Sequence, residues 1–89
     1  MSPRVFKESK FVFWFHSYDA QAENRASIHV GKAKQNDAGD PKIWLVPEIE
    51  IARAGRTLNR TELNDALKII KKNHKRLLEA WHAHKRKAS

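Results

Sequence analysis

The 89-residue sequence contains no cysteine, only three prolines and three glycines, and no apolar run that approaches the roughly 20 residues needed to cross a bilayer. The absence of cysteine excludes disulfide bonds, thiolate zinc ligands and thiol nucleophiles. Glycine-rich phosphate loops, nucleophile elbows and closely spaced metal-ligand motifs are also missing, so we expect no cofactor and no metal. The stretch 1–4 lacks the apolar core of a secretion signal, which favours a cytoplasmic location.

Acidic residues are scarce relative to basic ones, and the imbalance is concentrated at one end of the chain. Eighteen Lys and Arg residues against ten Asp and Glu give a formal net charge of +8. Residues 60–89 contain nine basic and three acidic residues. This charge favours polyanionic partners such as nucleic acid or an acidic protein. Because the chain is short and 40% hydrophobic, we expect a single globular domain over residues 1–89.

The first two thirds of the chain predict β-structure, over about residues 5–54. The segment 11–16 is aromatic and β-branched, which is typical of a strand that is buried on both faces. Polar residues at 18–25 predict a loop, and the Asn, Asp and Gly residues of 34–41 predict a hairpin connection. The other strands are expected at 27–31, 42–46 and 48–51, and a short helix is the alternative for the last of these.

The clearest element is an amphipathic helix at about residues 60–83, followed by a basic tail at 84–89. Asn59 and Glu62 have the spacing of a capping box at its start. Its apolar residues fall on one stripe, and they are Leu63, Ala66, Leu67, Ile70, Leu77, Leu78 and Trp81. Asn73 marks a possible kink or a break into two helices. The fold prediction is therefore α+β, with a three- to four-stranded antiparallel sheet packed against one long C-terminal helix.

One helix covers only one face of such a sheet, so the opposite face stays exposed unless something else covers it. Alternation places Trp14 on the face away from Phe11, Phe13 and Phe15, and Trp44 is a second aromatic residue expected there. An uncovered aromatic face in a small domain suggests an interface. We therefore expect a homodimer or a small partner protein.

The candidate functional residues form two groups. For chemistry we single out His29, with Arg25 and Lys32 near it in sequence, and His82 at the helix end, because RNA cleavage needs a base and cations for the phosphate. A hydrogen-bonded structural histidine and an exposed helix-end histidine are the alternatives. For nucleic-acid contact we single out the basic side of the helix, whose alternative is a solvated face that aids solubility; its residues are Lys68, Lys71, Lys72, Lys75 and Arg76.

The order of four segments adds a resemblance to a known family. They are Phe11–Phe15, Ser27–Val30, Lys42–Glu48 and Leu77–His82. Together, over about residues 5–84, they resemble the bacterial family called domain of unknown function 4160. That family typically reads Pro-Pro-His-x-His-Val before its second strand, and only the second histidine is kept here, as His29.

The resemblance implies a limited set of functions. Members are small and often look like one half of a toxin–antitoxin pair, so the leading hypothesis is a toxin-like component of a type II module that acts on nucleic acid or a nucleic-acid machine. The alternatives are an antitoxin or DNA-binding regulatory module without enzymatic activity, and a small interaction domain. Whether the chain is an enzyme is left open at this stage. The expected partners are a cognate small protein or a second copy, with RNA or DNA as the target and no membrane.

Overall fold

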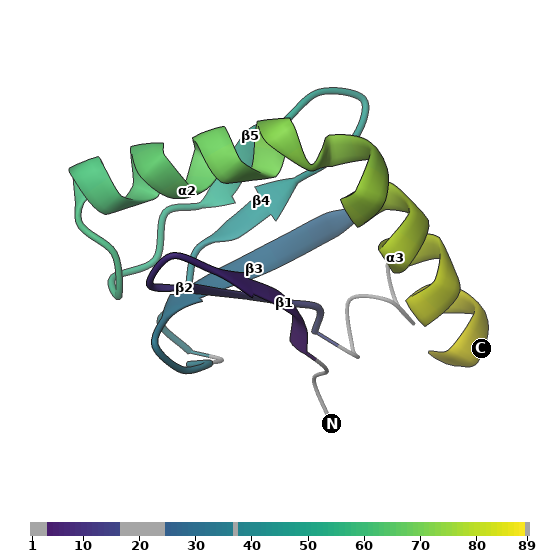
Figure 1. Ribbon diagram of the computed structural model, residues 1–89, viewed down its shortest axis with the longest axis horizontal. Coiled ribbons are helices and arrows are strands. Elements are labelled where there is room, and N and C mark those ends of the chain that lie inside the picture. Colours follow the sequence, from purple (N-terminus) through teal and green to yellow (C-terminus); the bar gives the residue numbers. More distant parts are fainter. Residues whose placement is uncertain (1–3, 17–24, 37, 89) are drawn as a thin grey trace.

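The computed structural model describes residues 4–16, 25–36 and 38–88, and it shows a curved sheet with two helices along one side (Figure 1). The elements follow the order β1 (Arg4–Glu8), β2 (Phe11–Trp14), β3 (Ser27–Lys32), β4 (Lys42–Trp44), β5 (Glu50–Arg53), α2 (Arg60–Lys72) and α3 (His74–Ala88). The α+β prediction is confirmed. The expected three to four strands and one helix are wrong in detail, since the sheet has five strands and the helical part is divided in two.

The sheet is an antiparallel meander in which the strands lie side by side in chain order, β1-β2-β3-β4-β5. Strand β1 was not predicted because three of its five residues are charged, which hides the apolar alternation. It forms as an edge strand because Phe6 stacks on the buried Phe13, with ring centroids 4.7 Å apart. Aromatic cross-strand packing of this kind stabilises a strand that has weak intrinsic propensity.

The other edge strand, β5, confirms the strand prediction near residue 50 and rules out the alternative of a short helix there. It covers Glu50–Arg53 rather than 48–51, and all four residues are exposed. The pairing with β4 shifts register between Ile51 and Arg53. A register shift on an exposed edge disfavours further strand pairing, as is common in natural sheets.

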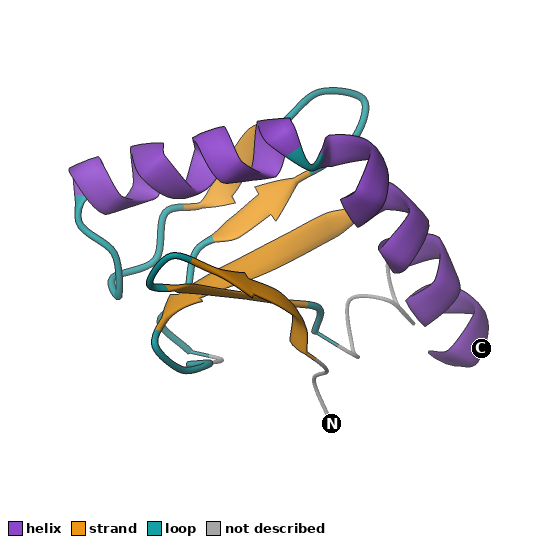
Figure 2. Cartoon of the chain, viewed as in Figure 1, coloured by secondary structure: helices purple, strands orange, loops and turns teal. Residues whose placement is uncertain are grey.

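The predicted single helix is divided at Asn73, where Figure 2 shows a short loop between two helical segments. Asn73 has φ −109° and ψ 19°, and its side-chain amide donates a hydrogen bond to the Ile69 carbonyl at 2.8 Å. The Ile69 carbonyl also accepts from the Asn73 backbone N–H at 3.1 Å, so both donors of Asn73 hold the end of α2 where the chain turns. The segment 84–88, expected as a tail, is helical, and Ser89 lies outside the described residues.

The core lies between the helices and one face of the sheet. The predicted strand face is confirmed, because Phe11, Phe13 and Phe15 all belong to the core cluster. The predicted helix stripe is also confirmed. Its fully buried members are Ala66, Ile70, Leu77 and Trp81, and its partly buried members are Leu63, Leu67 and Leu78.

The opposite face of the sheet does not present the exposed aromatic surface that we expected. Trp14 is fully buried, and its indole N–H donates to the Asp40 carboxylate at 2.9 Å. Trp44 is half-buried, with the Arg25 guanidinium 4.4 Å and the Lys42 ammonium 4.6 Å from its ring centroid. The argument for a homodimer from this face therefore loses its basis, and a partner stays a prediction.

Asp40 holds together the turn between β3 and β4, which confirms the predicted connection at 34–41. Its buried carboxylate accepts hydrogen bonds from the Trp14 indole, the Asn36 backbone N–H and the Thr57 hydroxyl. A buried carboxylate is tolerated when several donors surround it. Gly31 lies so close that a Cβ there would be 2.5 Å from the carboxylate.

One predicted segment lies almost entirely outside the described residues. The loop expected at 18–25 lies outside them except for Arg25. Within the described part of the chain, neither helix has the length and apolar character that a membrane-spanning segment requires.

Candidate functional site

Five cations lie close together in sequence across the two helices, which we call the basic ridge and define as Lys68, Lys71, Lys72, Lys75 and Arg76. All five side chains are exposed. No acidic residue interrupts the sequence between Asp65 and Glu79. The five side chains therefore lie on the surface, and their contact with nucleic acid stays a prediction.

Internal ion pairing leaves most of the basic ridge available. Lys72 has one long contact, 3.9 Å from its ammonium to the Glu8 carboxylate. Within residues 4–16, 25–36 and 38–88, Lys68, Lys71 and Lys75 form no ion pair. An exposed pair at such a distance contributes little to stability, so even Lys72 can exchange Glu8 for another anion.

Glu62, the acidic residue at the start of α2, forms its contacts within the protein and does not pair with the basic ridge. The Glu62 carboxylate accepts from the Asn59 backbone N–H at 3.0 Å and lies 3.0 Å and 3.3 Å from the ammonium groups of Lys32 and Lys10. The hydrogen bond from Asn59, followed by those from the two lysines, lowers the pKa of Glu62 to about 2. These contacts confirm the predicted capping box and give Lys32 a structural role rather than a place beside His29.

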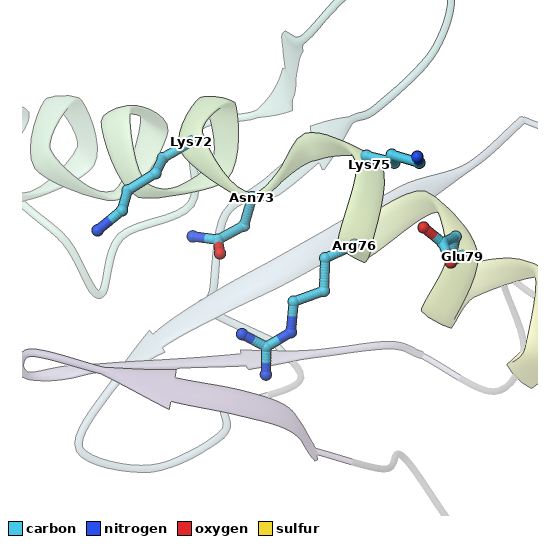
Figure 3. Close-up of a pocket in the computed structure, with 5 residues that line it drawn as sticks. All are labelled: Lys72, Asn73, Lys75, Arg76 and Glu79. Atoms are coloured by element: carbon cyan, nitrogen blue, oxygen red, sulfur yellow. The ribbon is translucent and has the colours of Figure 1, made fainter.

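The middle of the basic ridge coincides with the junction of the two helices. A pocket of about 400 Å³ lies there, lined by Lys72, Asn73, Lys75, Arg76 and Glu79. In Figure 3 the side chains of Lys72, Asn73 and Arg76 extend toward the side where β1 and β2 lie, whereas Lys75 and Glu79 point elsewhere. The turn at Asn73 thus brings cations from two helices around one hollow.

The structure does not support a catalytic centre built on His29, Arg25 and His82. His29 is buried, and its ring stacks on Trp14 with centroids 4.5 Å apart. Its neighbours Ile28 and Val30 face the helices, so His29 points to the opposite face of the sheet. His82 is exposed on α3, and its ring lies 5.3 Å from that of Trp81. The sheet therefore separates the two histidines.

Arg25 has contacts that explain it as a structural residue. Its Nε donates to the Val46 carbonyl at 2.6 Å, and its guanidinium donates to the Glu50 carboxylate at 2.7 Å while it lies over Trp44. These bonds join the start of β3 to the segment after β4, through Val46, and to the first residue of β5, Glu50. This role could not be recognised from the sequence, because the partners of Arg25 are more than 20 residues away.

Sequence reasoning missed a second group of polar residues on the face of the sheet away from the helices. Lys42 is the cross-strand neighbour of His29, and the ring of His16 lies 5.8 Å from that of His29. The alternation along β2, β3 and β4 was the available signal, since it assigns Trp14, His29 and Lys42 to one face. Pairing register was needed to make them neighbours.

His84 also differs from its expected place on an exposed tail. Its ring stacks on Phe15 at a centroid distance of 5.4 Å, so it helps to join α3 to the end of β2. His74 has a similar structural role, because its Nε2 lies 2.5 Å from the Leu45 carbonyl. In the described part of the chain, no three His, Asp or Glu side chains are grouped so as to hold a metal ion.

Comparison with known protein families places most of the chain in one family. Residues 11–82 match the family described as domain of unknown function (DUF4160). The chain belongs to this family. The matched region runs from β2 to α3, so it includes the basic ridge and the junction pocket. Searches among curated proteins and among solved structures found no match.

Proposed function

We propose that this DUF4160 protein is a toxin-like component of a type II toxin–antitoxin module, and that it binds nucleic acid or a nucleic-acid machine through the basic ridge. The observation that carries the proposal is the ridge itself, whose five cations are all exposed and lie in a stretch of sequence with no acidic residue between Asp65 and Glu79. Cations in such a row can neutralise successive phosphates and release their counterions.

The fold supports binding more than catalysis. The buried His29, the internally bonded Arg25 and the separate His82 do not share a surface, whereas the basic ridge lies on two helices that are fixed to the core by Ile70 and Leu77. A rigid element with exposed cations can contact phosphates without ordering a flexible segment first.

The binding experiment measures the affinity of the purified chain for single-stranded RNA and duplex DNA over a series of salt concentrations. Five phosphate contacts predict a slope of log K against log salt of about −4 to −5 on duplex DNA. The double variant Lys72→Glu/Arg76→Glu should reduce the magnitude of this slope by about 2. Its matched control is Lys7→Glu/Lys34→Glu, which changes net charge equally at exposed residues outside the ridge.

The outcomes separate the candidate functions. An unchanged slope in the ridge variant, or an equal loss in both variants, contradicts the proposed surface. The toxin role requires growth arrest when the chain is expressed and rescue when the neighbouring small gene is co-expressed. Tight duplex DNA binding without growth arrest would instead identify a regulatory module.

A further inference from the structure

The N-terminus of α3 has an unusual charge arrangement. Its first turn begins His74-Lys75-Arg76 and contains no acidic residue. The N-terminal end of a helix carries partial positive charge, so cations there are unfavourable by about 0.3–1 kcal/mol each. Local rules of this kind are often broken at functional sites. An anion at this end would remove the unfavourable term.

Arg76 is also held in position before any ligand arrives. Its guanidinium carbon lies 4.9 Å from the centroid of the Phe6 ring, and Phe6 in turn stacks on the buried Phe13. A guanidinium lying on an aromatic ring keeps its N–H edge available for an acceptor. This contact favours one orientation of the guanidinium and needs no carboxylate partner.

We propose that the junction pocket is a seat for one phosphate group of a nucleic-acid backbone, held by Lys72 and Arg76 with Lys75 at its rim. The proposal rests on the proposed nucleic-acid function and names the anchoring point within the basic ridge. The planar fork of Arg76 suits two phosphate oxygens, and Lys72 supplies a second charge from the preceding helix. The pocket volume of about 400 Å³ accommodates such a group.

Two carboxylates oppose this seat and make it a weak, exchangeable one. Glu79 lines the pocket, and Glu8 lies 3.9 Å from the Lys72 ammonium. Lys75 and Glu79 point away from Lys72 and Arg76 (Figure 3), so the two cations that face the seat, together with Glu8, leave a small net positive charge, which is consistent with one phosphate rather than several. The variant Glu79→Gln should therefore raise the affinity for phosphate by about two- to fivefold.

The experiment titrates the full chain with inorganic phosphate while NMR follows the backbone amides. We expect the largest shifts at residues 72–79 in the native chain and their loss in Lys72→Gln/Arg76→Gln. The matched control Lys68→Gln/Lys71→Gln removes the same charge from the ridge outside the pocket and should keep the shifts. Both variants must retain the native amide spectrum elsewhere, which shows that they are folded.

A second arm uses a short single-stranded oligonucleotide with and without a 5′-phosphate. Loss of the pocket cations should weaken its binding by about tenfold or more, a larger loss than in the control. Equal losses in the two variants overturn the phosphate seat and leave the basic ridge as a general surface. Pocket shifts with phosphate but no oligonucleotide binding refute the proposed function and keep the phosphate seat. Dependence on the 5′-phosphate assigns the seat to a chain end rather than to the backbone.

Discussion

The two helices start in opposite ways, although they follow one another with only Asn73 between them. Helix α2 begins with a capping box in which Asn59 and Glu62 bond to each other's backbone, and Glu62 also binds two lysines. Helix α3 begins with three residues that can carry positive charge. The first start uses charge to stabilise the fold, whereas the second lacks that stabilisation and carries the cations that we propose bind a phosphate.

The contrast between the two helix starts is meaningful only if α3 packs on the core as firmly as α2. Ile70 and Leu77 are both fully buried in the same core. We predict that Ile70→Ala and Leu77→Ala each reduce the free energy of unfolding by about 2–5 kcal/mol, because both leave a cavity. Chemical denaturation measures this. A much smaller loss for Leu77→Ala would show that α3 is loosely docked, and its charges would then need no functional explanation.

A smaller effect tests the capped start of α2. Asn59→Ala removes the side-chain acceptor for the Glu62 backbone N–H, and we expect a loss of about 0.5–2 kcal/mol in unfolding free energy. Asn64→Ala is the matched control, since Asn64 is exposed within the same helix. It should be neutral or slightly stabilising because alanine favours helix. Equal losses in the two variants would mean that the cap does not stabilise α2.

Lowering the pH should remove part of the stability that Glu62 provides at the start of α2. The pKa of Glu62 is lowered from 4.5 to about 2 in the folded chain, so its stabilising contacts are fully present above pH 4.5. We predict that stability falls as the pH decreases from 4.5 through about 2. Thermal unfolding across this range measures the fall, and Glu62→Gln should flatten it. An equally steep fall in the variant would assign the effect to other carboxylates.

The smallest predicted effect tests the charge difference between the first turns of α2 and α3. Lys75→Glu gives α3 the acidic first turn that α2 already has, and we expect stability to rise by about 0.3–1 kcal/mol. The same variant should weaken phosphate binding at the junction. Thermal unfolding and phosphate titration of one sample measure both, and Lys68→Glu in the middle of α2 is the control. A variant that loses stability together with binding would contradict the trade-off proposed for this turn.

Much of the architecture could be predicted because it depends on local pattern. The aromatic alternation of Phe11, Phe13 and Phe15 identified the core face of a strand, and the helical stripe with its Asn59 cap identified the start and the buried side of the helical part. Strand β1 could not be recognised, since it depends on contact between Phe6 and Phe13 rather than on its own sequence pattern.

The charge of the candidate site could be predicted from the sequence, but the positions of its side chains could not. The sequence located the basic residues on one side of the helices, and the structure leaves them exposed there. It also suggested His29 with Arg25, and separately His82 at the helix end, as candidates for chemistry, but the sheet keeps the two histidines apart and Arg25 bonds to Val46 and Glu50. Proximity in sequence was a poor guide because antiparallel pairing joins residues that are far apart along the chain.

By itself, the sequence determined the fold class, the apolar stripe and the polarity of the last third of the chain, because periodicity and charge are properties of neighbouring residues. Only the tertiary structure decided that Trp14 is buried against Asp40, that the helix turns at Asn73, and that Arg76 rests on Phe6 beside Lys72. These features depend on contacts between segments that meet only when the sheet and helices close on a shared core.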